Sequence, residues 1–239
     1  MSLSMSMSMD SFPAGFRALV IGSTGAIGAA FMDLLQADPR CASVQGLHRH
    51  SQPKLDFHDE ASIAVAAAQL SQSAPFHLII NATGILHSEG MMPEKRLADL
   101  HMQQMLETFR INTFGPALLL RHFTPLLAKD RSVMAMLSAK VGSIGDNRLG
   151  GWYSYRASKA ALNMLVKTAA IEIGRSKPDA LLIALHPGTV NSNLSKPFRG
   201  AEIGRAPHIA AAEMLAVING LSANDSSEFF SYKGQRLPW

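Results

Sequence analysis

Tyr155 and Lys159 stand four residues apart in a segment with helical character, so both side chains are expected on one face of a helix. A free tyrosine has a pKa of about 10 and is a poor proton donor or acceptor at neutral pH. A fixed ammonium nearby favours the phenolate and lowers that pKa. Such a tyrosine can give a proton to a carbonyl oxygen as hydride reaches the carbon, which is worth about 10²–10⁴ in rate. The same spacing also occurs between ordinary side chains on the surface of a helix.

A glycine-rich turn over residues 22–28 follows the apolar run of residues 18–21 and opens a helical stretch. Small residues at such a turn let the backbone approach a pyrophosphate, whose charge then lies at the helix N-terminus. The pattern therefore indicates a dinucleotide site. A tight turn from strand to helix also favours glycine without any ligand, so the turn alone leaves both interpretations open.

The next strand end carries the residue that would choose between the two nicotinamide dinucleotides. An acidic residue about 20 residues after the glycine turn binds the ribose hydroxyls of NAD, whereas an arginine there suits the 2′-phosphate of NADP. Residues 47–50 contain no Asp or Glu, and Arg49 is the natural ligand for that phosphate. We expect NADP(H) to be favoured, with NAD(H) still possible. A solvated surface charge is the alternative for Arg49.

Apolar runs that alternate with helical stretches must position these residues. Strands are expected at residues 18–21, 43–47, 77–80, 132–137 and 181–185. A helix is expected from the glycine turn to residue 35, and further helices at residues 61–70, 97–127 and 155–174. The stretch of residues 97–127 is expected to be interrupted near Gly115 and Pro116. This alternation predicts parallel strands joined by crossover helices, and so an α/β chain with a layered sheet.

The N-terminal segment and the composition limit the class of protein that the chain can be. Residues 1–13 are low in complexity and are expected to be a flexible N-terminal arm, which leaves residues 14–239 as one domain. The 239 residues are 47% hydrophobic and 17% charged, which can build a sizeable core. The net charge of +4 contains no long run of one sign, so a nucleic-acid partner is not expected.

Other classes of site are also disfavoured. One cysteine, Cys41, excludes an internal disulfide framework and a multi-cysteine metal site. The nine histidines show no metal-ligand spacing, so we expect no metal. No stretch approaches 18 consecutive apolar residues, so no membrane-spanning helix is expected. These features predict a cytoplasmic protein.

The order of the motifs resembles the short-chain dehydrogenase/reductase family over residues 16–239. The resemblance is carried by the glycine turn, by residues 81–84 after a strand, by Asn112, by a serine before a helix, by Tyr155 with Lys159, and by residues 187–188. Within the family, residues 141–147, 153–163 and 234–239 resemble the C-factor and sniffer-like carbonyl reductase branch. The resemblance implies a single-domain Rossmann fold, a doubly wound parallel sheet with helices on both faces.

The family pattern implies which residues bind the cofactor. Asp56 would meet the adenine ring, although it could instead cap the helix that follows. Lys159 would also hold the nicotinamide ribose. The full set of implied cofactor residues is Gly22, Ser23, Thr24, Ile27, Gly28, Arg49, Asp56, Asn81, Ala82, Gly84, Tyr155, Lys159, Pro187, Gly188, Thr189, Val190 and Ser192.

The pattern also implies catalytic roles for Asn112, Ser138, Tyr155 and Lys159. Asn112 would support Lys159 and a water that relays protons. The family usually has two serines shortly before a glycine equivalent to Gly142, and the second serine is catalytic. In this chain the two positions hold Ser138 and Ala139. We expect Ser138 to bind the carbonyl, with Ser143 as the second choice. If Ser138 only ends the strand, the site would rest on Tyr155 and Lys159.

Together these features predict an NADP(H)-dependent oxidoreductase that interconverts a carbonyl and an alcohol. The alternatives are an NAD-linked alcohol dehydrogenase of the same fold and a signalling or sensing protein that binds the dinucleotide with little turnover. Substrate choice is expected to lie in residues 85–95 and 191–206. The resemblance implies a homodimer or homotetramer, joined through the helices that carry Asn112 and Tyr155.

Overall fold

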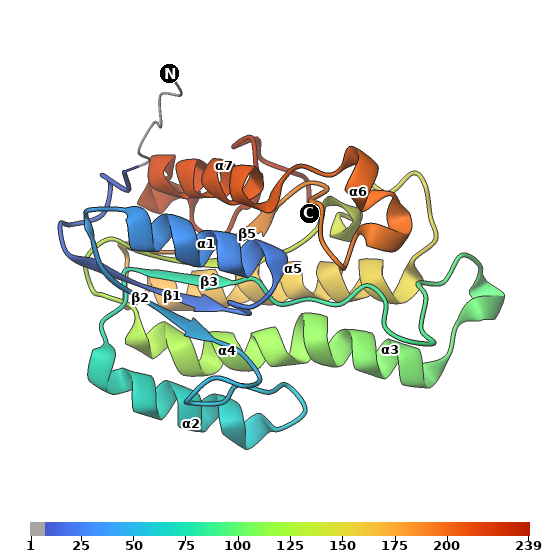
Figure 1. Ribbon diagram of the computed structural model, residues 1–239, viewed down its shortest axis with the longest axis horizontal. Coiled ribbons are helices and arrows are strands. Elements are labelled where there is room, and N and C mark those ends of the chain that lie inside the picture. The colour runs from blue at the N-terminus through green and yellow to red at the C-terminus, as the bar shows by residue number, and fades with distance from the viewer. Residues whose placement is uncertain (1–7) are drawn as a thin grey trace.

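A computed structural model describes residues 8–239 and contains a six-stranded sheet with helices on both faces (Figure 1). The strands are β1 (Phe16–Ile21), β2 (Cys41–Leu47), β3 (Leu78–Asn81), β4 (Ser132–Leu137), β5 (Ala180–His186) and β6 (Phe229–Ser231). They pair in the order β2-β1-β3-β4-β5-β6, and every neighbouring pair is parallel. The expected doubly wound α/β fold is confirmed.

Two helical layers cover the sheet. One face carries α1 (Ala26–Ala37) and α7 (Pro207–Gly220), and the other carries α2 (Glu60–Leu70), α4 (Gly115–Phe123) and α5 (Tyr153–Gly174). Successive residues of a strand point to opposite faces, so Ala18 and Val20 of β1 enter the first layer, while Leu19 and Ile21 enter the second. No helix within residues 8–239 is both long enough and apolar enough to cross a membrane.

The long helical stretch expected at residues 97–127 is divided. It contains a 3-10 turn (Leu97–Asp99), α3 (Met102–Phe109), a π-helical turn (Arg110–Phe114) and α4. Gly115 begins α4 where the chain packs against Phe57, and a Cβ at Gly115 would lie 2.3 Å from that ring. Pro116 suits the first turn of a helix because its missing N–H would have no helical partner.

Two elements near the C-terminus were not expected from the sequence. The α7 helix packs Met214, Leu215 and Ile218 against the sheet, and β6 adds three residues beside β5. A strand of three residues gives little period-two signal, so its pairing with β5 defines it. The short helix α6 (Gly200–Ile203) lies in the irregular segment before α7.

The predicted N-terminal arm is too long. Residues 1–7 lie outside the described part of the chain, but Met9 and Phe12 are buried in the core beside α1 and α7. The Met9 backbone N–H also donates to the Asp38 carboxylate at 2.8 Å. The packed body therefore begins before residue 14, because two large apolar side chains lie within the low-complexity segment.

Candidate active site

The site lies where the strand order reverses. β1 has β2 on one side and β3 on the other, and a parallel sheet opens a crevice at the carboxyl ends of its strands at such a point. A cavity of about 360 Å³ is found there. Its lining includes six residues that the sequence assigned to the cofactor, namely Gly22, Thr24, Arg49, Asp56, Ala82 and Gly84.

The glycine turn forms the floor of this cavity and opens α1. Gly22 has φ +82°, and a Cβ on Gly28 would lie 2.1 Å from the Gly22 carbonyl oxygen, so the tight turn requires glycine at both positions. Gly25 precedes α1, and no side chain caps that helix. The amides of its first turn are thus free to bind an anion.

Ser23 and Ile27 are not among the residues that line the cavity. The Ser23 hydroxyl donates to the Leu47 carbonyl oxygen at 3.4 Å, which ties the turn to the end of β2. Ile27 packs against the core beneath α1. Both residues shape the turn, and their direct contact with a cofactor stays a prediction.

Arg49 follows β2 with an exposed side chain at the cavity. His48 and His50 flank it in the cavity wall, and the His50 N–H donates to His48 Nδ1 at 3.2 Å. Within residues 8–239, no carboxylate forms an ion pair with Arg49. A guanidinium with no protein partner at a dinucleotide cavity can bind a phosphate.

Asp56 also faces the cavity, where Lys54 and His58 approach its carboxylate at 3.2 and 3.3 Å. The pKa of Asp56 lies below its usual range, chiefly because the carboxylate accepts the backbone N–H of His58. Asp56 is not the cap of α2. Asp59 is the N-cap, and its carboxylate accepts the Ser62 N–H at 3.4 Å.

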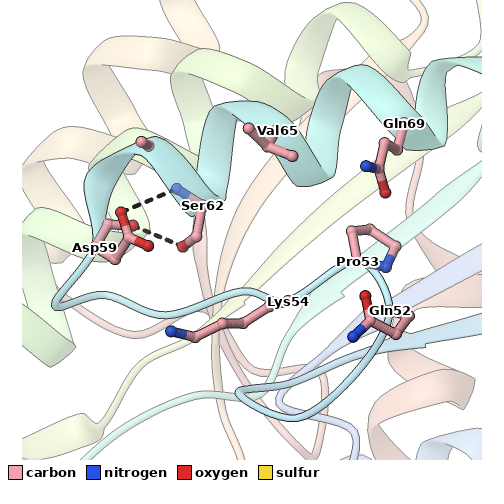
Figure 2. Close-up of a pocket in the computed structure, with 8 residues that line it drawn as sticks. Gln52, Pro53, Lys54, Asp59, Ser62, Val65 and Gln69 are labelled. Atoms are coloured by element: carbon pink, nitrogen blue, oxygen red, sulfur yellow. Dashed lines mark hydrogen bonds between the residues drawn. The ribbon is translucent and has the colours of Figure 1, made fainter.

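Figure 2 shows a second cavity, of about 320 Å³, beside this cap. It lies between the loop of residues 52–54 and α2, and the bonds between Ser62 and Asp59 close one end of it. Its lining contains none of the residues expected to bind a cofactor or to take part in catalysis. We therefore place the site at the first cavity.

The segment after β3 connects the first cavity with the residues predicted to be catalytic. Asn81 is buried, and its Oδ1 accepts the N–H and the hydroxyl of Thr83 at 3.2 and 2.7 Å. A Cβ on Gly84 would lie 3.5 Å from Asn112 Oδ1 and 3.6 Å from Lys159 Nζ. Gly84 is therefore the point at which the predicted cofactor segment, Asn112 and Lys159 meet.

Asn112 lies in the π-helical turn between α3 and α4 and is fully buried. Its side chain accepts the Ile85 N–H at 2.8 Å and donates to the Ile85 carbonyl at 2.8 Å and to Ser158 Oγ at 3.1 Å. Wider π turns often mark functional sites. Asn112 is thus a bridge between the loop after β3 and α5, and not the surface residue that an isolated helical Asn suggests.

Tyr155 and Lys159 lie one turn apart on α5, and both are buried. Lys159 Nζ donates to the Leu137 carbonyl at 3.0 Å and lies 6.0 Å from the centre of the Tyr155 ring. Burial raises the pKa of Tyr155 to about 12 and lowers the pKa of Lys159 to about 8. The expected lowering of the tyrosine pKa is therefore wrong for the protein alone, because loss of solvation outweighs the ammonium at this separation.

The other side of Tyr155 is apolar. Tyr155 clusters with Leu86 and Ala139, and the surrounding residues are Val141, Trp152, Leu194 and Phe198. The ring of Trp152 lies edge-on to Tyr155 at 6.2 Å and to Phe198 at 5.0 Å. Neither aromatic residue was predicted at the site, because the cluster is assembled from four separate segments of the chain.

Both candidate serines make hydrogen bonds within the protein. Ser138 donates its hydroxyl to Asn163 Oδ1 at 2.6 Å in the buried contact between β4 and α5. Ala139 points to the opposite side, toward Tyr155, as the alternation of an extended chain requires. Ser143 is buried too, and its hydroxyl donates to the Trp239 carbonyl at 3.3 Å. The structure thus brings Ala139 to Tyr155, and the bond to Asn163 favours a structural role for Ser138 over the predicted catalytic one, a choice that activity measurements decide.

The segment after β5 also lies at the carboxyl ends of the parallel strands. Gly188 has φ +70° and is crowded by Arg205 and Tyr232, so a side chain there would clash. Arg205 lies 3.4 Å from the centre of the Tyr232 ring and donates to the Pro187 carbonyl. Arg205 was not predicted to lie beside this segment, because no local sequence motif indicates it.

Of the other residues assigned to this segment, Thr189 is exposed and its carbonyl accepts the Arg205 N–H at 3.0 Å. Val190 is buried in the core, and Ser192 Oγ lies 3.3 Å from Ser195 Oγ. These contacts order the segment within the protein. Binding of a cofactor by Pro187, Gly188, Thr189, Val190 and Ser192 stays a prediction.

Comparisons with known proteins agree with this geometry. Residues 30–215 match a family described as "Enoyl-(Acyl carrier protein) reductase". The 1-hydroxy-2-glutathionyl-2-methyl-3-butene dehydrogenase of Rhodococcus sp. (strain AD45) is 32% identical over 79% of this chain and 80% of its own length. C-signal of Myxococcus xanthus is 32% identical over 70% of this chain and 95% of its own length.

A solved structure extends the likeness to the whole fold. The NADPH-bound carbonyl reductase from chicken fatty liver superposes with a TM-score of 0.81 at 25% identity, covering 95% of this chain and 96% of that one. The predicted family is confirmed, and the similarity to C-signal supports the predicted C-factor-like branch within it. The chain belongs to the short-chain dehydrogenase/reductase family and is an oxidoreductase that works with a nicotinamide dinucleotide.

Proposed function

We propose that the protein uses NADPH to reduce a carbonyl to an alcohol and that the same site runs the reverse reaction with NADP⁺. The observation that carries the proposal is the convergence of Asn112 and Lys159 beside Gly84, with Tyr155 one turn before Lys159 on α5, at a cavity where Arg49 has no carboxylate partner among the described residues. The order of these groups matches the order of the dinucleotide, with its phosphates at α1 and its nicotinamide near Tyr155.

The cavity residues fit such a cofactor. The uncapped amides of α1 suit the pyrophosphate, Arg49 suits the 2′-phosphate, and Asp56 suits the adenine end. Lys159 would hold the nicotinamide ribose, and the segment from Pro187 to Ser192 would pack on the carboxamide. When bound, the nicotinamide supplies or accepts the hydride.

Tyr155 performs the proton chemistry in this mechanism. In the protein without ligands, burial raises the pKa of Tyr155 to about 12, so the hydroxyl keeps its proton at neutral pH, and transfer of that proton to the carbonyl oxygen requires that the phenolate be stabilised as it forms. The ammonium of Lys159 then stabilises the phenolate that remains. Asn112 holds both backbone groups of Ile85 and thereby keeps the proton-relay region in place. Ala139 adds no hydroxyl beside the reacting carbonyl.

The substrate that suits this site is a neutral carbonyl compound with an apolar or aromatic substituent. Trp152 and Phe198 are the largest of the apolar and aromatic side chains that pack around Tyr155, and the His87 ring lies edge-on to Phe198 at 5.9 Å. Apolar and aromatic side chains bind apolar surface, which favours a substrate with such a substituent. A panel of aryl and alkyl ketones and aldehydes, matched with keto acids of the same size, tests this choice.

Assembly is proposed to bring two copies together through α3 and α5. Exposed apolar side chains gather on these helices and on the π turn between α3 and α4: Met102, Leu106, Phe114, Met164 and Ile171. A second copy would cover this face, as in the oligomers expected from the family resemblance. Light scattering of the wild type and of a Met164→Glu variant distinguishes a dimer or tetramer from a monomer.

We also propose a cytoplasmic location. The support comes from the composition: one cysteine in 239 residues cannot form an internal disulfide. Proteins without disulfides are typical of a reducing compartment. Fractionation of cells that produce the native protein tests it, with activity expected in the cytoplasmic fraction.

Turnover of the carbonyl panel with NADPH and NADH is the test of the main proposal. Higher kcat/KM with NADPH supports it, whereas higher kcat/KM with NADH favours the NAD-linked alcohol dehydrogenase. A second candidate is a dinucleotide-binding sensor with little turnover, favoured by the methyl group of Ala139 beside Tyr155 in place of a hydroxyl. Tight NADPH binding without turnover across the panel would identify that second function.

A further inference from the structure

A carboxylate that the proposed chemistry does not use is buried at the start of the catalytic helix. Glu94 is 2% exposed and lies in the loop between β3 and α3. No Lys, Arg or His within residues 8–239 pairs with it. A buried carboxylate is costly unless hydrogen bonds satisfy it, so the partners of Glu94 show what it does.

Those partners are all in the first turn of α5. The Glu94 carboxylate accepts the Ser154 N–H at 3.1 Å and also the Ser154 hydroxyl. The Glu94 carbonyl oxygen accepts the Trp152 N–H at 2.5 Å. Trp152 is the N-cap residue, has φ +51°, and caps nothing with its own side chain. Glu94 therefore supplies the cap from 60 residues away in the sequence, where a negative charge also interacts well with the helix dipole.

The two backbone positions that Glu94 holds come just before the reacting side chain in the first turn of α5. Tyr155 follows Ser154 directly, and the Trp152 ring lies edge-on to the Tyr155 ring at 6.2 Å. A first turn without its cap frays, and misplacement of a catalytic group by about 1 Å can cost about 10²-fold in rate. The position of the Tyr155 hydroxyl thus depends on these bonds.

The loop of residues 85–95 is anchored at both ends to the catalytic machinery. Asn112 binds both backbone groups of Ile85 at one end, and Ser154 binds Glu94 at the other. Because this loop also contributes Leu86 to the apolar cluster around Tyr155, its placement and that of Tyr155 are linked.

We infer that Glu94 is a positioning residue, which fixes the first turn of α5 and thereby sets Tyr155 and Trp152 in their working positions. The inference rests on the proposed role of Tyr155 for its kinetic consequence. Its structural consequence, a fixed Trp152, does not need a substrate. Glu94 itself stays remote from the chemistry and acts through the backbone of α5.

The experiment compares Glu94→Ala, Glu94→Gln and the control Glu60→Ala, which removes an exposed carboxylate from the first turn of α2, outside both parts of the site. NADPH titration counts the folded sites, and kcat is expressed per site. For Glu94→Ala we expect kcat to fall about 10- to 100-fold with the NADPH Kd within about twofold of wild type. Gln keeps an acceptor for the Ser154 N–H, so Glu94→Gln should recover most of the rate, and Glu60→Ala should equal the wild type.

An unchanged kcat per site in Glu94→Ala would overturn the inference, as would equal losses in the Ala and Gln variants, since charge rather than hydrogen bonding would then matter. If Glu94→Ala does not fold, Ser154→Ala removes only the hydroxyl contact and should give a smaller loss of kcat, and full activity there would count against the inference.

A readout without substrate separates this inference from the proposed function. The chain has two tryptophans, so a Trp239→Phe background leaves Trp152 as the only one. Glu94→Ala in that background should shift the emission of Trp152 to longer wavelength and increase its quenching by acrylamide, whereas Glu60→Ala should do neither. An unchanged Trp152 signal contradicts the inference even if no carbonyl compound is reduced.

Discussion

The two halves of the site are built differently. The cofactor half, at the ends of β1, β2 and β3, is an open cavity of about 360 Å³ with a glycine turn and charged groups that face it. The substrate half, around Tyr155, is an apolar cluster contributed by the loops after β3, β4 and β5 and by the start of α5. One half is made from contiguous motifs, while the other depends on contacts between distant segments.

Under the proposed function, the difference reflects how each part would recognise its ligand. Phosphates are bound by backbone amides and by a guanidinium, groups that a short motif can place. A carbonyl with an apolar substituent is bound by shape, which needs side chains from several loops. Tyr155 lies between the halves, so substitutions there and on either side test whether the division is real.

Removal of the Tyr155 hydroxyl should have the largest effect, because both halves converge on it. Tyr155→Phe should lower kcat by about 10²–10⁴-fold and leave the NADPH Kd within a few-fold of wild type. Steady-state kinetics and fluorescence titration measure the two quantities. Tyr153→Phe, two residues earlier in α5, is the control and should remain active. Full activity in Tyr155→Phe would refute the proton-transfer mechanism.

Loss of Arg49 should damage only the cofactor half. A charge-assisted hydrogen bond is worth about 1.5–3 kcal/mol, so Arg49→Ala should weaken NADPH binding by about 10- to 100-fold and leave NADH binding unchanged. Arg148→Ala removes an exposed arginine from a different loop and serves as the control. Equal losses for both dinucleotides would show that Arg49 does not recognise the 2′-phosphate.

The pH dependence should report on Lys159, which joins the halves. Burial lowers the pKa of Lys159 to about 8, so its ammonium is present below that pH and is lost as the pH rises through it. At pH 9, about one-tenth of the ammonium remains, and we expect kcat/KM for carbonyl reduction to be about tenfold lower than at pH 7. A guanidinium stays charged, so Lys159→Arg should lack this decline. The same decline in that variant would assign it to another group.

A hydroxyl added to the substrate half should increase activity modestly. Ala139 faces Tyr155, so the hydroxyl of Ala139→Ser would lie beside the reacting carbonyl oxygen. One neutral hydrogen bond is worth about 0.5–1.5 kcal/mol, which predicts a two- to about tenfold gain in kcat/KM. Ala139→Val fills the same space without a donor and should not increase kcat/KM. No gain in the Ser variant would show that the carbonyl binds elsewhere.

Ser138 should have the smallest kinetic effect. Its hydroxyl donates to Asn163 within the β4–α5 contact, so Ser138→Ala should leave kcat nearly unchanged and lower the free energy of unfolding by about 1–3 kcal/mol. Urea unfolding beside steady-state kinetics measures both. Ser143→Ala is measured in parallel. If one of the two variants lowers kcat without a change in stability, the serine that it replaces is the catalytic one.

A good part of this outcome was predictable from sequence because it depends on local signals. The five longer strands, the glycine turn and the spacing of Tyr155 and Lys159 each follow from residues that are close in the chain. The order of the motifs along the chain also predicted the family. The three residues of β6 and the core position of Met9 gave no comparable signal, because their burial comes from neighbours far away in sequence.

The sequence by itself determined the parallel α/β architecture, the position of the dinucleotide turn and the helical pair of Tyr155 and Lys159. Only the tertiary structure decided which side chain beyond β4 faces Tyr155, since Ser138 and Ala139 are neighbours that an extended backbone turns in opposite directions. It also decided that burial raises the pKa of Tyr155 and that Glu94 caps α5. These features depend on desolvation and on contacts between residues far apart in the chain, which local spacing does not encode.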